Sequence, residues 1–311
     1  MTGQAKVAAQ PEVDFLLIGA QKSATTSLWH HIAAHPATFV PATKEIEFFS
    51  DPRRFEKGID WYWQTYFDGA PPAACKGEAT TQYMMFPAVP GRIRRAFPDV
   101  KMIALLRNPI DRAQSHHRMS SMRGHESRSF EESIDPLLRD TDHQSAAIDP
   151  NRDYLRLGEY GRILADYLAH FPREQFCVLF TEDLEADPAR LSRLVYEFLE
   201  IDPAFRPDTL EKRFNVSGQQ AFPRGVELLR RAVGMARRTP LVGRLITQDR
   251  YDAFKFWTRT ELQVRVAPNE GLDSAAHARL VDHFAPDVER LRSAFGVDPP
   301  WPEFMSRDTN P

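Results

Sequence analysis

A lysine and a run of hydroxylated residues follow the first apolar segment of the chain. The apolar residues 15–18 end at Gly19, and Lys22 stands three positions later. An amphipathic run begins at Ser27, so the pattern is typical of a strand, a tight loop and a helix N-terminus. A helix N-terminus presents unpaired backbone N–H groups and the positive end of the helix dipole, which bind anions. The loop is therefore predicted to bind a phosphate group.

The position of this lysine argues against an ordinary P-loop kinase or NTPase. That pattern needs Gly, four residues, Gly, Lys and then Ser or Thr. Counted from Gly19, the last three positions hold Ala24, Thr25 and Thr26, because the lysine has moved to residue 22. We also find no strand that ends in a convincing acidic ligand for magnesium. A Mg-nucleotide enzyme is thus disfavoured, and it stays as the alternative interpretation.

An arginine stands at the end of a second buried run. Residues 101–106 read as a buried strand, and Arg107 follows directly. Pro109 suits the first turn of a helix over residues 110–122. Ser115 lies about two helical turns after this proline, where its hydroxyl can face the strand end. A guanidinium can make paired contacts with a phosphate that a lysine cannot, so this segment is a second candidate phosphate site.

The elements that position these residues alternate between strand and helix over residues 14–200. This alternation predicts an α/β fold with a central parallel sheet covered by helices on both faces. A short strand is expected at Phe39 and Val40, followed by a charged and aromatic loop over residues 41–50. Ligands of such sheets bind at the carboxyl ends of the strands. We therefore expect the lysine loop, Arg107 and the charged loop to converge on one crevice.

The domain organisation is predicted to be a single domain over residues 1–311, with a core at about 13–225. Residues 123–153 are polar and irregular around a helix at 130–139, and are the best candidate for a mobile insert. The C-terminal part, about 226–311, is expected to be helical. Within it, residues 274–295 read as one or two helices that Pro286 interrupts.

Composition excludes several classes of protein. The net charge of −3 gives no global basic field for nucleic acid. The two cysteines are about a hundred residues apart, so a disulfide framework is not expected, and no metal-ligand spacing occurs. No signal peptide is visible, and no run approaches the ~20 apolar residues that span a bilayer. A cytoplasmic protein without a bound metal is expected, and the oligomeric state cannot be predicted.

Several segments together resemble one enzyme family, the sulfotransferases that use 3′-phosphoadenosine 5′-phosphosulfate (PAPS). The heparan-sulfate-type and bacterial branch is the most similar. Residues 19–28 resemble its 5′-phosphosulfate loop, which belongs to a P-loop-like nucleotide-binding fold, and residues 105–115 resemble its 3′-phosphate motif. The other similar segments are Lys-Glu-Ile-Glu-Phe-Phe (44–49), Gly-Glu-Ala-Thr-Thr-Gln-Tyr (77–83), Gly-Glu-Tyr (158–160), Glu-Asp-Leu (182–184) and Asp-Pro (187–188). The resemblance covers about residues 13–225, and several motifs in the right order make it specific.

The resemblance implies a role for each matched residue. Lys22 would bind the donor and stabilise the departing phosphate, and Glu45 would be the base that deprotonates the acceptor. Arg107 and Ser115 would bind the 3′-phosphate. Arg224 and Gly225 resemble part of a loop that covers this phosphate in related enzymes. The full set of expected PAPS contacts, which would also hold the product PAP, is Lys22, Ser23, Ala24, Thr25, Thr26, Ser27, Arg107, Ser115, Arg224 and Gly225.

The chain departs from the family pattern on the acceptor side. Glu47 replaces a histidine, Ala79 a lysine and Thr81 a proline. The acceptor is thus expected not to be a heparan chain, but a hydroxylated small molecule or another sugar. Weaker acceptor contacts are expected at Lys44, Glu47, Glu78 and His116, and the adjacent histidines could offer another base. These departures also leave open a relative that binds the nucleotide without transferring a sulfuryl group.

Overall fold

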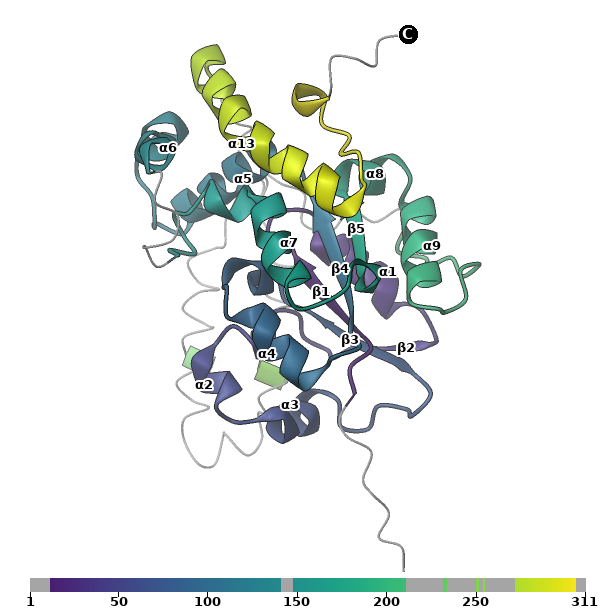
Figure 1. The fold of residues 1–311 in the computed structure, drawn as a ribbon. Helices are drawn as coiled ribbons and strands as arrows, with labels where there is room; N and C mark the ends of the chain where they lie inside the picture. The colour runs from purple at the N-terminus through teal and green to yellow at the C-terminus, as the bar shows by residue number, and fades with distance from the viewer. Residues whose placement is uncertain are drawn as a thin grey trace, which may run out of the picture.

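A parallel five-stranded sheet forms the centre of the described chain (Figure 1). The computed structural model describes residues 12–140, 148–210 and 272–305, with residues 232–233, 250–251 and 254. The strands are β1 (Phe15–Gly19), β2 (Thr38–Phe39), β3 (Cys75–Ala79), β4 (Lys101–Leu106) and β5 (Phe176–Phe180). Their order is β2-β3-β1-β4-β5, and all four pairings are parallel. The predicted parallel sheet is confirmed, and β1 lies at its centre.

Helices cover both faces of this sheet (Figure 1). The α-helices are α1 (Thr25–Ala33), α2 (Pro52–Phe55), α3 (Ile59–Tyr66), α4 (Val89–Ala96), α5 (Pro109–Met122), α6 (Phe130–Arg139), α7 (Tyr160–Leu168), α8 (Thr181–Ala186), α9 (Pro188–Phe198) and α13 (Ser274–Phe295). Short 3-10 turns are η1 (Thr81–Met85), η2 (Arg156–Gly158), η3 (Arg173–Gln175) and η4 (Pro302–Phe304). No described helix is long and apolar enough to cross a membrane.

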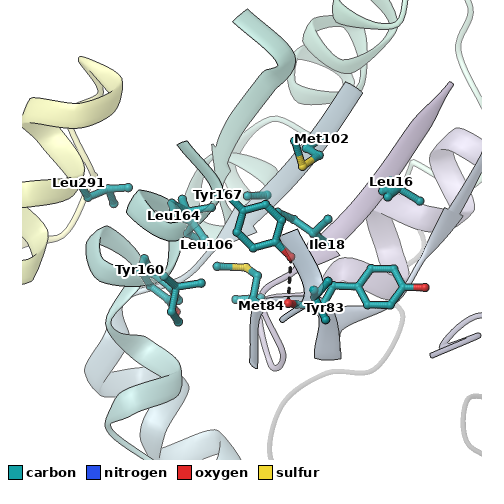
Figure 2. Close-up of a cluster of buried hydrophobic side chains, with 14 of the residues drawn as sticks. Leu16, Ile18, Tyr83, Met84, Met102, Leu106, Tyr160, Leu164, Tyr167 and Leu291 are labelled. Carbon is teal, nitrogen blue, oxygen red and sulfur yellow. Dashed lines mark hydrogen bonds between the residues drawn. The ribbon is translucent and has the colours of Figure 1, made fainter. Parts of the chain in front are cut away.

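Alternate residues of the central strands enter two separate cores, as the two-residue period of a strand requires. Leu16, Ile18 and Met102 lie on the face that packs against α4, α7 and α13. Figure 2 shows part of this core, where the Tyr167 hydroxyl donates to the Tyr83 carbonyl at 2.9 Å. The opposite face carries Phe15, Leu17, Ile103 and Leu105, which pack against α1 and α9. The central strands β1 and β4 are therefore held between two packed layers.

Local signals fix where the helices at the strand ends begin. Asn108 caps α5, since its Oδ1 accepts from Ile110 N at 3.0 Å, and Pro109 occupies the first turn. Ser129 and Glu132 form a reciprocal capping box at the start of α6. The helix predicted over residues 130–139 is confirmed. The mobility suggested for residues 123–153 stays a prediction.

The expected break at Pro286 is wrong, because α13 runs without interruption through this residue. A proline inside a helix loses one backbone hydrogen bond, a cost that packing can offset. The next residue, Asp287, accepts from the backbone N–H groups of Gly161 at 2.8 Å and Arg162 at 2.8 Å. Asp287 thus joins α13 to the first turn of α7. A Cβ on Gly161 would lie 2.3 Å from the Asp287 carbonyl oxygen, so the two helices meet backbone to backbone.

Candidate active site

The loop between β1 and α1 has the form expected of an anion-binding loop. Lys22 and Ala24 adopt left-handed backbone conformations with φ of 74° and 56°. Ala24 is the N-cap of α1, and no side chain caps the helix there. The first-turn N–H groups of Thr25 and Thr26 therefore stand at the positive end of the helix dipole. This arrangement suits a phosphate group.

Neighbouring strand ends hold this loop in place. The Thr181 hydroxyl lies 3.1 Å from the Ser23 carbonyl oxygen and 2.9 Å from that of Leu106. Tyr160 donates its hydroxyl to the Arg107 carbonyl at 3.0 Å. The loop and the end of β4 are thus tied together by side chains from α7 and α8.

Arg107 and the lysine loop come together as predicted, because β1 and β4 are adjacent strands. The Arg107 Nη1 atom lies 3.5 Å from the Lys22 carbonyl oxygen, and the Arg107 side chain is one-fifth exposed. Its Nη2 atom is 3.7 Å from the Asp111 carboxylate. Ser115 is buried on α5, two turns further along. A phosphate on Arg107 would therefore lie close to the anion-binding loop.

Three further arginines add positive charge around Lys22. Burial, and then the charges of Arg123, Arg118, Arg107 and Arg112 in that order, lower the Lys22 pKa to about 8. Arg112 is fully buried, and its Nε and Nη1 atoms have no hydrogen-bond partner among the described residues. Burial lowers the Arg112 pKa to about 10. Gathering and burying so much positive charge is costly, and a bound anion would reduce that cost.

Sequence reasoning missed these arginines, although a signal was present. Arg112, Ser115 and Arg118 are spaced by three residues, which places them along one side of α5. Since Ser115 was assigned to a phosphate, its helical neighbours at that spacing were candidates too.

The charged loop after β2 meets the anion-binding loop through Lys44. This buried ammonium donates to the Thr25 hydroxyl at 2.7 Å and lies 3.4 Å from Glu45 Oε1. Burial lowers the Lys44 pKa, which the Glu45 charge opposes. Lys44 therefore contacts the donor side of the site, whereas it was expected on the acceptor side.

Glu45 is held in one orientation by the start of η1. Its carboxylate accepts from the Thr81 backbone N–H at 2.9 Å, and the Thr81 hydroxyl donates at 3.1 Å. The Glu45 N–H donates to the Ala79 carbonyl at 2.8 Å. The side chain keeps one-fifth of its surface exposed, so a substrate can still reach it.

The other acceptor-side residues lie differently from expectation. Glu47 is half-buried and accepts from the Gln82 amide at 2.8 Å. Glu78 and His116 are fully buried, so neither side chain is open to an acceptor in this structure, and their acceptor contacts stay a prediction. The His116 Nε2 atom is engaged with the Pro150 carbonyl at 3.0 Å, and burial holds its pKa well below the usual value. His117 likewise contacts a carbonyl, that of Arg128, so neither histidine is placed as a base.

The C-terminal segment reaches the same strand end. Asn108 Nδ2 donates to Glu303 Oε2 of η4 at 2.9 Å, and the Asn108 N–H donates to Glu182 Oε1 at 3.0 Å. Trp301 is fully buried beside this contact. The residue after Arg107 is thus fixed by both α8 and the C-terminal turn. The predicted cap at Arg224 and Gly225 lies outside the described residues.

Residues 12–223 match the model of the sulfotransferase domain. The chain belongs to this family. Among curated relatives, bovine bifunctional heparan sulfate N-deacetylase/N-sulfotransferase 2 is 31% identical over 208 residues, which cover 61% of this chain and 22% of that protein. Mouse heparan sulfate glucosamine 3-O-sulfotransferase 3B1 is 28% identical over 212 residues, which cover 67% of this chain and 50% of that protein. The chain thus spans half or less of the length of these relatives.

A solved sulfotransferase from Alicyclobacillus acidocaldarius shares the fold. It superposes with a TM-score of 0.64 at 24% identity, covering 92% of this chain and 96% of that one. The predicted family and the predicted P-loop-like α/β architecture are confirmed. Lys22, Arg107 and Glu45 therefore stand at the strand ends of a sulfotransferase fold.

Proposed function

We propose that this chain transfers a sulfuryl group from PAPS to a hydroxyl or amine of a carbohydrate or small-molecule acceptor. One observation carries the proposal. Lys44 bridges the Thr25 hydroxyl at 2.7 Å and the Glu45 carboxylate at 3.4 Å, so a base stands directly beside an anion-binding loop. A donor bound on that loop would thus lie close to the base.

The cationic groups fit a nucleotide with phosphates at both ends of its ribose. The first-turn N–H groups of α1 and Lys22 suit the 5′ side, while Arg107 suits the 3′-phosphate. The two unpartnered nitrogen atoms of buried Arg112 lie in the same positive environment. Binding of an anionic nucleotide would offset the mutual repulsion of these groups.

The side chains have distinct tasks in the transfer. Glu45 takes the proton from the acceptor as the acceptor oxygen or nitrogen forms its bond to sulfur. The bond between sulfur and the leaving phosphate oxygen breaks in the same displacement, and Lys22 neutralises the charge left on that oxygen. Cationic side chains and backbone N–H groups thus stabilise the developing charge.

A direct test combines transfer and binding. Purified protein is incubated with sulfur-labelled PAPS and a phenol, an amino sugar or a long-chain alcohol, and PAP affinity is measured by calorimetry. We expect transfer to at least one acceptor class, abolished in Glu45→Gln with PAP affinity retained. Arg107→Ala should lose ~10-fold or more in PAP affinity, the effect of a lost charge-assisted pair. Arg95→Ala, an exposed arginine on α4, is the matched control.

Other outcomes would point elsewhere. Stabilisation by Mg-ATP but not by PAP would favour the kinase alternative and overturn the proposal. Tight PAP binding with no transfer to any acceptor would indicate a binding protein without turnover. A cytoplasmic location stays a prediction from the sequence, which cell fractionation would test.

A further inference from the structure

A second carboxyl group, that of Glu78, lies near the candidate base Glu45. Glu78, at the end of β3, is fully buried. Its Oε1 accepts from the Tyr83 hydroxyl at 2.5 Å and from the Tyr62 hydroxyl at 3.1 Å. Its Oε2 accepts from the Thr80 hydroxyl at 2.7 Å. Three hydroxyl donors, from α3, from η1 and from the residue that precedes η1, therefore surround one buried carboxyl group.

Thr80 connects Glu78 by hydrogen bonds to the loop that contains Glu45. A hydroxyl has a single hydrogen, and that of Thr80 goes to Glu78, so its lone pairs accept from the Glu47 N–H at 3.2 Å. The Thr80 N–H donates to the Leu17 carbonyl at 3.1 Å, which fixes it against β1. The next residue, Thr81, holds the Glu45 carboxylate. Two consecutive threonines, Thr80 and Thr81, thus hold the loop that contains Glu45 and Glu47.

The loop needs this support because its backbone is strained. Glu45 and Glu47 adopt left-handed conformations, with φ of 63° and 60°. Such conformations cost of order 1 kcal/mol for non-glycine residues and persist only where surrounding contacts impose them. The contacts of Thr80 and Thr81 supply that constraint.

The three hydroxyl hydrogens that point at the carboxyl group favour ionised Glu78. The ionised carboxylate accepts all three hydroxyl hydrogens, whereas protonation would add a fourth hydrogen and force one hydroxyl to turn away. Burial is the main cause that raises the Glu78 pKa, to about 7, while the three hydroxyl bonds oppose it and the Glu45 charge adds to it. The facing phenols, Tyr62 and Tyr83, have pKa values raised well above their usual value and stay protonated donors.

We propose that Glu78 is a positioning residue that orients Glu45 through Thr80 and its neighbour. The inference rests on the proposed function, in which Glu45 is the base. Ionised Glu78 keeps the Thr80 lone pairs turned toward the loop, and its protonation releases the loop backbone. Turnover should therefore fall on the acid side with an apparent pKa near 7.

The test uses the acceptor that receives most label from sulfur-labelled PAPS. Thr80→Val removes the relay without changing side-chain size, and should lower kcat ~10-fold or more with PAP affinity unchanged within about twofold. Thr80→Ser keeps the hydroxyl and should restore turnover. Tyr196→Phe deletes another buried hydroxyl, bonded to the His31 carbonyl on the opposite face of the sheet, and should leave kcat unchanged.

The pH profile provides an independent readout. Glu78→Gln cannot titrate, so the fall in kcat near pH 7 should disappear while PAP binding persists. An unchanged acid limb in Glu78→Gln, or wild-type kcat in Thr80→Val, would overturn the positioning role. A wild-type chain that binds no PAP would instead overturn the proposed function, so the two failures are distinguishable.

Discussion

The lowered pKa of Lys22 makes nucleotide affinity depend on pH in a direction that can be worked out. Burial and the neighbouring arginines favour the neutral amine in the free protein, with a pKa of about 8. A phosphate beside Lys22 favours the ammonium, so binding should return the pKa toward the ordinary 10.5. At a pH between these two pKa values, the protein must take up a proton at Lys22 when it binds PAP.

The two pKa values set the size of the effect. At pH 7 almost all of the free protein has charged Lys22, so affinity should be constant there. At pH ~9.5 only about 3% of the free protein would carry the charge, and Kd should weaken ~30-fold, or ~2 kcal/mol. The stability of the ligand-free protein should change in the opposite sense. The cost of keeping Lys22 charged is fully present below pH ~8 and is relieved as pH rises toward the unfolded value.

Calorimetry in buffers of different ionisation enthalpy measures both Kd and proton uptake. We expect wild-type protein to take up close to one proton on binding PAP at pH ~9. Lys22→Arg carries a charge that does not titrate in this range, so its Kd should stay flat with pH. Lys101→Arg makes the same change at the opposite end of β4 and should behave as wild type. A flat wild-type profile, or an equal slope in Lys22→Arg, would refute the reasoning.

Three further outcomes can be measured on the same protein. Gly161→Ala should lower Tm much more than Gly158→Ala, because the new methyl meets the Asp287 backbone at 2.3 Å in the first case and a ring edge at 3.2 Å in the second; equal losses would contradict the close helix contact. Asp287→Ala should cost ~1–2 kcal/mol in urea unfolding, since two N–H groups at the start of α7 lose their acceptor. Arg107→Lys should weaken PAP ~10-fold but leave adenosine 5′-phosphosulfate, which lacks the 3′-phosphate, unaffected; equal losses for both nucleotides would argue against the assigned phosphate.

Chain-local rules were enough to predict the strand ends and the helix starts at the site. Lys22 and Arg107 each come after a buried apolar run, and adjacent parallel strands bring such ends together. The helix start at Pro109 was likewise predicted from its proline. The placement of Glu45 beside the anion-binding loop was expected from the shared strand-end position.

The remaining features depend on tertiary placement. Thr81 lies 36 residues from Glu45, and the two meet only because β3 pairs beside β1 in one register. Glu78 was expected to face an acceptor because it lies in the segment over residues 77–83 that resembles the acceptor side of the family pattern. It is instead hydrogen-bonded to hydroxyls from α3 and η1. Local sequence patterns could not predict these contacts. Pro286 is tolerated because packing outweighs its local preference.

The contact between Asn108 and Glu303 bears on how the protein is made. The two residues are 195 positions apart, yet Asn108 comes directly after the arginine assigned to the 3′-phosphate. During synthesis, β1 and β4 leave the ribosome long before η4. The sheet can pair early, but Asn108, beside Arg107, acquires its Glu303 partner only after residue 303 has emerged. Nascent chains stalled before residue 303 should therefore hold a sheet whose nucleotide end is still incomplete.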